Sequence, residues 1–201
     1  MRSTLDIFER VAMALFFANM VYRLLPHYES SGNIVDIFIL FSDGASTFFV
    51  LAHRRTSTLS LSASDWGLTA IATALPTMVM PTAIAPLVPL LVCNILLVHG
   101  LVLQIAAKLT LRRSFGLVPA NRGVKISGPY RLLRHPMYAG YILTHLAFLG
   151  AYPSLWNLGI YAAAFLAQCA RILAEERVLG RDPAYLAFMQ TTRYRLIPFV
   201  F

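Results

Sequence analysis

The sequence predicts an all-α protein: a polytopic membrane bundle of five to six transmembrane helices that ends in a helical hairpin. Of its 201 residues, 58% are hydrophobic and 13% are charged, whereas soluble domains average about 45–50% and about 25%. The hydrophobic residues lie in blocks too long for a chain of this size to bury internally. The net charge is +8. This composition excludes an ordinary soluble globule and a disordered chain.

The apolar residues form six blocks, each of which we expect to be a helix. In chain order these are residues 8–25, 34–53, 66–80, 87–107, 138–151 and 155–173. At about 1.5 Å per residue, the fourth and sixth blocks approach the roughly 30 Å hydrocarbon core of a bilayer, whereas the fifth is short. Only residues 152–154 separate the last two blocks, which predicts a tight hairpin whose first arm can begin at Pro136. The alternative is five spans and a partial hairpin.

The basic residues predict how the bundle is oriented in the membrane. Nearly all Lys and Arg residues lie in residues 53–55, in residues 108–135 and in the C-terminal tail, while the other connecting segments carry almost none. By the positive-inside rule, the basic segments and both termini face the cytoplasm. This placement accounts for the net charge without a nucleic-acid partner.

The cysteines and the polar residues narrow the search for a functional site. Cys93 and Cys169 lie inside apolar runs, far from any Cys-X-X-Cys or His-rich spacing. We therefore expect neither a disulfide framework nor a bound metal. The polar chemistry is concentrated in residues 108–201, which follow the apolar N-terminal residues 1–107.

A first polar cluster precedes the fifth helix. Pro136 suits the first position of that helix, so Arg134 and His135 lie at its N-terminal mouth. A helix N-terminus and two cationic or potentially cationic side chains favour an anionic group, such as a carboxylate or a phosphate. The alternative is that both residues only anchor the helix to lipid headgroups.

A second cluster, Arg171 with Glu175 and Glu176, ends the sixth helix. Arg171 and Glu175 are four residues apart and share a face, while Glu176 lies about 100° around the helix. The hairpin brings this cluster to the same level as the first. The simpler interpretation is a local helix ion pair beside a solvated acidic face.

The two clusters together would suit a zwitterionic ligand with an aromatic part. Cationic groups would bind its carboxylate, and the Glu side chains would bind its ammonium and hydroxyl groups. The faces of tyrosine rings would stabilise a cationic centre in the ligand. S-adenosylmethionine has these features. A dinucleotide or a phosphorylated substrate would suit parts of the same site.

Several motifs in this half occur in one known family. They are Gly128-Pro129-Tyr130, the run from Arg134 to Gly140, Arg171 with Glu175-Glu176, and a terminal Tyr194-Arg195-Leu196-Ile197-Pro198. In this order and spacing the chain resembles the isoprenylcysteine carboxyl methyltransferase-like family and, more loosely, membrane phospholipid methyltransferases. The resemblance covers about residues 120–201.

The resemblance implies a membrane methyltransferase that binds S-adenosylmethionine in a cytoplasm-facing pocket, with an opening toward the bilayer for a lipophilic acceptor. Residues 1–107 would then be the scaffold on the acceptor side, and residues 108–201 the catalytic half. The residues assigned to the cofactor are Lys125, Gly128, Tyr130, His135, Pro136, Tyr138, Gly140, Glu175 and Glu176.

The catalytic candidates are Arg171, Glu175 and Arg134. The family places an essential arginine near the acceptor, for which Arg171 is the first candidate and Arg134 the second. A carboxylate acceptor needs no general base, whereas an amine or thiol acceptor would lose its proton to Glu175, Glu176 or His135.

Two other functions compete with methyl transfer. Membrane sterol and steroid reductases share a related C-terminal pattern and use NADPH, but they would need more cationic contacts for the extra phosphate. A non-enzymatic membrane protein that keeps the fold would bind no nucleotide tightly.

Overall fold

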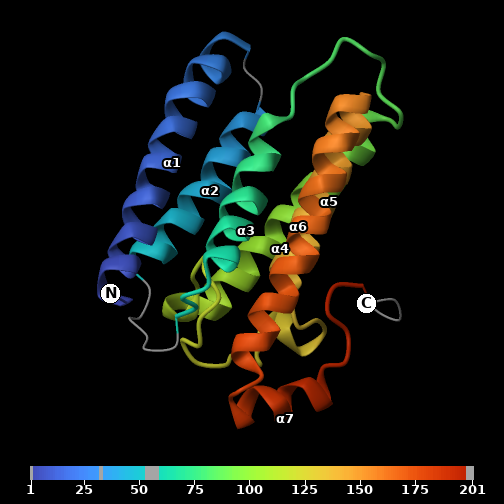
Figure 1. The fold of residues 1–201 in the computed structure, drawn as a ribbon. Coiled ribbons are helices and arrows are strands. Elements are labelled where there is room, and N and C mark those ends of the chain that lie inside the picture. The colour runs from blue at the N-terminus through green and yellow to red at the C-terminus, as the bar shows by residue number, and fades with distance from the viewer. Residues whose placement is uncertain (1, 32–33, 53–58, 198–201) are drawn as a thin grey trace.

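The computed structural model describes residues 2–31, 34–52 and 59–197, which are helical with irregular connections and contain no strand. Figure 1 shows the helices running up and down in a bundle, with the last helix lying across one end. We call this end, where α4 and α6 finish, the basic end. The helices are α1 (Arg2–Ser31), α2 (Ile34–Ala52), α3 (Ala63–Ala74), α4 (Leu90–Leu111), α5 (Pro136–Ala151), α6 (Leu155–Leu179) and α7 (Pro183–Thr191), with short 3₁₀ turns at Leu75–Met78, Arg112–Ser114 and Gly128–Arg131.

Each of the six predicted apolar blocks forms a helix, but several helices begin or end at other residues than predicted. The third helix stops at Ala74 because Pro76 opens a 3₁₀ turn, where its missing N–H costs no α-helical bond. The fifth helix begins at Pro136, as the sequence predicts, and is short. The sixth continues to Leu179 and so carries the whole Arg171–Glu176 cluster. The division predicted at residue 107 falls inside α4.

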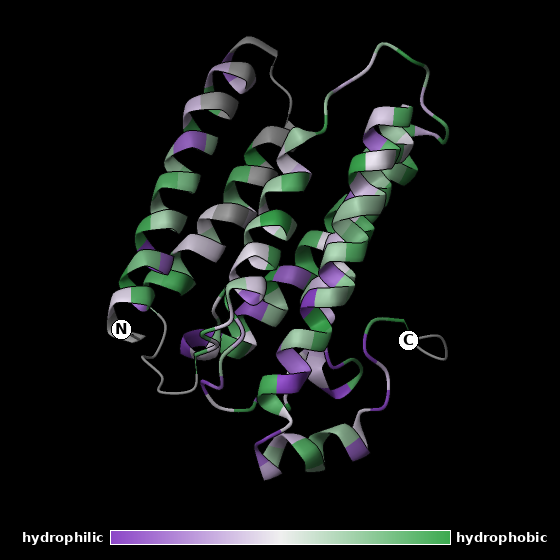
Figure 2. Ribbon diagram, in the orientation of Figure 1, coloured by the Kyte–Doolittle hydropathy of each residue, from purple (hydrophilic) through white to green (hydrophobic). Residues whose placement is uncertain are grey.

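Among the residues that the structure describes, two helices are long and apolar enough to cross a membrane, namely Leu90–Ser114 and Leu155–Leu179. Large hydrophobic side chains are exposed along both, among them Leu91, Val102 and Leu166. Figure 2 shows that the hydrophilic residues gather at the basic end, around the end of α6 and α7. This distribution suits an apolar solvent around the bundle and water at its end.

The opposite end of the bundle is closed by a buried amide. Asn157, which is fully buried in α6, donates from Nδ2 to the carbonyls of Met80 and Tyr152, both at 2.8 Å. Its Oδ1 accepts from the backbone N–H of Met80 at 3.0 Å. Ser154 caps the start of α6 by accepting from the Asn157 N–H. The proline-rich segment before α4 is thereby fixed to the turn of the hairpin.

The closest helix contact, between α4 and α5, depends on two glycines. A Cβ at Gly140 would lie 2.6 Å from the carbonyl oxygen of Gly100, and one at Gly100 would lie 2.7 Å from that of Gly140. The backbones of the two helices are therefore in direct contact at these glycines. This contact fixes α5 against α4 and sets the position of its N-terminal end, where the first polar cluster lies.

The basic end is completed by α7, which the sequence analysis did not predict. Asp182 caps it by accepting from the Ala184 N–H, Pro183 takes the first position, and Tyr185 and Phe188 pack into the core. The chain after α7 returns to the start of α5. There the N–H groups of Arg134 and His135 donate to the carbonyls of Tyr194 and Arg195, both at 2.9 Å.

We expect Gly140→Ala to destabilise the fold by about 1–3 kcal/mol, because the added methyl group meets backbone that cannot move aside. The measurement is the thermal unfolding midpoint in detergent. The matched control is Gly159→Ala on α6, where an added Cβ has no described atom within 4 Å and helix propensity favours alanine by about 0.5–1 kcal/mol. Equal midpoints for the two variants would contradict this account of the helix contact.

Candidate functional site

Two cavities lie at different depths of the bundle. The first, which we call the end cavity, is at the basic end and has a volume of about 100 Å³. Its lining comes from residues 114–125, the start of α5, the end of α6 and α7. Among the residues predicted from the sequence it contains Lys125, Tyr130, Arg134, His135, Tyr138 and Glu175.

The second, the bundle cavity, has a volume of about 390 Å³ and is lined by all six helices of the bundle. Its walls are mainly apolar and aromatic, with contributions from Met13 and Phe16 of α1 and from Tyr161 of α6. Polar side chains also reach it from several helices. Arg171 and Gln168, one turn apart on α6, are two of them.

A common wall, formed by Phe115, Met137 and Tyr138, separates the two cavities and lines both. The Tyr138 hydroxyl donates to Oε1 of Glu175, which faces the end cavity. The Arg171 guanidinium, which faces the bundle cavity, has its Nε 3.4 Å from the same oxygen and its Cζ 5.5 Å from the Tyr138 ring centroid. One cation and one carboxylate therefore flank the wall from opposite sides.

Glu176 points away from this wall and binds three cationic or potentially cationic side chains. Its Oε1 accepts from Nη1 of Arg134 at 2.9 Å and lies 3.2 Å from Nε2 of His135. Its Oε2 accepts from Nε of Arg195 at 2.9 Å. The two clusters predicted from the sequence do meet here. Glu176 itself lines neither cavity.

The segment after α4 forms part of both cavities and is held from two sides. The carbonyl of Leu117 accepts from Nη2 of Arg171 at 2.6 Å. From α1, the Glu9 carboxylate accepts from the N–H groups of Leu117 and Val118 and from Nη2 of Arg122. Sequence analysis found neither Glu9 nor Arg122 as site residues.

Burial changes the titration of several groups at the basic end. It raises the pKa of the Tyr130 and Tyr185 hydroxyls, so both stay protonated donors at neutral pH. It lowers the pKa of Arg122, against the opposing charge of Glu9. The Tyr185 hydroxyl is buried without a hydrogen-bond partner among the residues that the structure describes. It is a polar group that a ligand in the end cavity can satisfy.

Besides Glu176, three more predicted cofactor residues lie outside both cavities. Pro136 is buried as the first residue of α5, and Gly140 packs against Gly100. Gly128 adopts a positive φ of 57° in the turn beside Thr110, where a side chain would be strained. Each has a clear role in the backbone, and their assignment to a cofactor stays a prediction.

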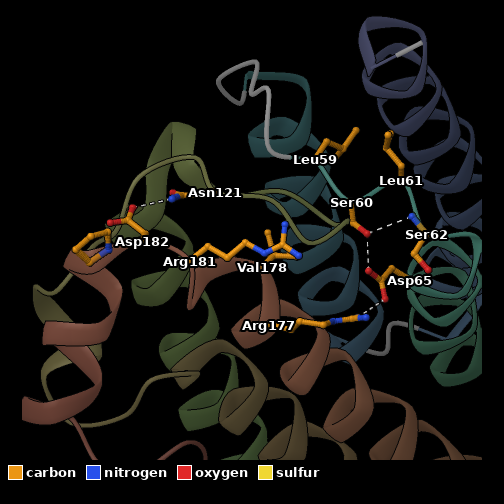
Figure 3. Close-up of a pocket in the computed structure, with 11 residues that line it drawn as sticks. Leu59, Ser60, Leu61, Ser62, Asp65, Asn121, Arg177, Val178, Arg181 and Asp182 are labelled. Carbon is orange, nitrogen blue, oxygen red and sulfur yellow. Dashed lines mark hydrogen bonds and ion pairs between the residues drawn. The ribbon is translucent and has the colours of Figure 1, made fainter.

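A polar crevice of about 770 Å³ lies beside the end cavity. Figure 3 shows two of the contacts between its lining residues. Arg177 donates to Asp65 at 2.7 Å, and Asn121 donates to Asp182 at 2.6 Å. These contacts fasten the start of α3 to the end of α6, and the segment after α4 to the start of α7. Over the described ranges, no group of three or more His, Cys, Asp or Glu side chains is arranged to hold a metal ion.

The profile of one protein family, described as phospholipid methyltransferase, matches residues 82–182. The chain belongs to this family. Membership confirms the resemblance predicted from the sequence and indicates a membrane methyltransferase. No functionally curated protein matches the sequence.

The part of the chain that matches the family includes α4, the hairpin and both polar clusters. It excludes α1, which supplies Glu9, and also α7 and the returning tail. The matched region thus carries Arg134, Arg171 and Glu175, while the segments outside it complete the walls around them.

We expect Glu176→Gln to loosen the returning tail of this methyltransferase, because the amide keeps the size of the side chain but loses the charge that Arg134 and Arg195 face. Charge-assisted hydrogen bonds are worth about 1.5–3 kcal/mol, so local opening should increase by at least about tenfold. The measurement is trypsin cleavage after Arg193 and Arg195, followed by mass spectrometry. Glu29→Gln, at an exposed position of α1, is the control, and an unchanged cleavage rate in Glu176→Gln would be the contrary result.

Proposed function

We propose that the protein transfers a methyl group from S-adenosylmethionine in the end cavity to a lipophilic acceptor in the bundle cavity. The observation that carries this proposal is the wall shared by the two cavities, with Glu175 on one side and Arg171 on the other. A site that carries charged side chains, next to a mainly apolar site and separated from it by Phe115, Met137 and Tyr138, suits transfer from a charged donor to an apolar acceptor.

The residues of the end cavity fit the chemistry of this cofactor. Arg134 and Lys125 suit its carboxylate, Glu175 suits its ammonium or its ribose hydroxyls, and the Tyr138 ring suits its sulfonium. The unpartnered Tyr185 hydroxyl adds a donor. The volume of about 100 Å³ is below the roughly 300 Å³ of small-molecule sites, so binding must move part of the wall outward.

In the proposed reaction, the rate enhancement comes mainly from positioning the two reactants and from excluding water. When bound, S-adenosylmethionine supplies a methyl group activated by its sulfonium. Arg171 orients the acceptor from the bundle cavity. The side chains of the shared wall must move aside on binding so that the acceptor atom reaches the methyl group. For an amine or thiol acceptor, Glu175 takes the proton, with the Tyr138 hydroxyl as its hydrogen-bond partner. A carboxylate acceptor needs no base.

The family description makes a phospholipid the first acceptor class to test. The bundle cavity supports a lipophilic acceptor because its lining is mainly apolar, and Arg171 provides a polar end for a head group. We further propose a multi-pass protein whose basic end, with both termini, faces the cytoplasm. The concentration of Lys and Arg at that end supports this orientation.

We expect Arg171→Ala to abolish methyl transfer while leaving the affinity for S-adenosylmethionine largely unchanged, because the side chain faces the bundle cavity. Purified protein and native lipid extract would be incubated with methyl-labelled S-adenosylmethionine, and the labelled product identified by mass spectrometry. Calorimetry would give the cofactor affinity. The control is Arg181→Ala, an exposed residue near the end of α6 that lines neither cavity.

Three outcomes would count against the proposal. Equal loss of turnover and cofactor affinity in Arg171→Ala would remove its acceptor role. Tight binding of NADPH in place of S-adenosylmethionine would favour a reductase. Binding of neither nucleotide by the wild-type protein would favour a non-enzymatic membrane protein.

A further inference from the structure

We infer that Glu9 of α1 is a positioning residue for methyl transfer, because it fixes the Leu117 peptide that in turn holds Arg171. This inference rests on the proposed function, which gives Arg171 its role at the acceptor. It assigns a part in the reaction to a helix outside the region matched by the family.

Glu9 is a buried carboxylate whose oxygens are both occupied. It is 2% exposed. Its Oε1 accepts from the N–H groups of Leu117 at 2.6 Å and Val118 at 3.1 Å, and its Oε2 accepts from Nη2 of Arg122 at 3.2 Å. A charge is costly to bury unless it is paired and hydrogen-bonded. The three partners named here offset that cost, and each of them lies on the segment after α4.

One residue, Leu117, is hydrogen-bonded to both Glu9 and Arg171. Leu117 donates its N–H to Glu9 at 2.6 Å, and its carbonyl accepts from Nη2 of Arg171 at 2.6 Å. Leu117 also lines the bundle cavity beside Arg171. The Leu117 carbonyl and the Val118 N–H belong to one rigid peptide plane. Because Glu9 also accepts from that Val118 N–H, it restricts where the Leu117 carbonyl, and hence the guanidinium, can lie.

The other contacts of Arg171 do not make this one redundant. Glu175 and Tyr138 hold the guanidinium from α6 and α5, and Leu117 holds it from the opposite segment. A guanidinium is directional, so all these contacts are needed to define its plane. Gly116 leaves room for the Arg122 side chain, which pairs with Glu9. A Cβ at Gly116 would lie 2.1 Å from Nη1 of Arg122.

The test combines Glu9→Gln with Arg171→Lys in a double-mutant cycle. Glu9→Gln keeps an acceptor oxygen but removes the charge that Arg122 faces. We expect kcat for methyl transfer to a phospholipid to fall at least tenfold, since small misplacements of a positioning group carry costs of this size. In the Arg171→Lys background, Glu9→Gln should slow transfer by less than threefold, because two residues that act through one contact are not additive. Glu29→Gln is the matched control for loss of one negative charge from α1.

A second measurement does not depend on turnover. Phenylglyoxal modifies exposed arginines, and peptide mass spectrometry gives the modification rate of Arg171 itself. We expect this rate to rise at least threefold in Glu9→Gln and to stay at the wild-type value in Glu29→Gln. Gly116→Ala places a methyl group against Arg122 and so displaces this partner of Glu9. It should also raise the modification rate of Arg171, and it replaces Glu9→Gln in the test if that variant folds poorly.

The inference is overturned if Glu9→Gln slows the wild type and the Arg171→Lys variant by the same factor, which would mean that Glu9 only stabilises the fold. It is also overturned if the modification rate of Arg171 does not change. Absence of methyl transfer by the wild-type protein would instead count against the proposed function, and the modification rate would then decide the inference alone.

Discussion

The arrangement of the site depends on one carboxylate, Glu176, which balances positive charge from separate parts of the chain. Arg134 and His135 come from the start of α5, and Arg195 comes from the returning tail. Without the negative charge, these groups would repel one another in a closed space where charges are weakly screened. Because Glu176 lies near the end of α6, the same contacts fasten three segments at one level. The end cavity is the space that remains between them.

The neighbouring carboxylate serves a different purpose because of helix geometry. Successive residues of an α-helix are rotated by about 100°, so when Glu176 points to the tail, Glu175 points to Tyr138 and Arg171. One carboxylate is used to assemble the walls, and the other is left at the wall between the two cavities. This division explains how adjacent residues of one type can differ so much in their surroundings.

Much of the fold could be predicted from the sequence because the apolar blocks are long and the basic segments are distinct. The hairpin fixes the levels of Arg134 and Arg171, so the meeting of the two clusters follows from connectivity alone. Other features depend on neighbours that no local pattern reveals. Gly140 belongs to a family motif, yet it packs against Gly100, a residue of another helix. Helix α7 is short, and its signal is only an Asp-Pro start followed by Tyr185 and Phe188.

Glu9 shows the limit of sequence reasoning most clearly. In the sequence it follows Asp6 and precedes Arg10, a pattern typical of an exposed helix start, and 108 residues separate it from Leu117. Only the packing of α1 against the segment after α4 gives it a role. Without Glu9, two buried N–H groups and Arg122 would lose this partner, and each unsatisfied group costs about 1–3 kcal/mol. Residues 82–182 therefore contain the side chains that we propose to act in the reaction, but the support for their position comes in part from the first helix.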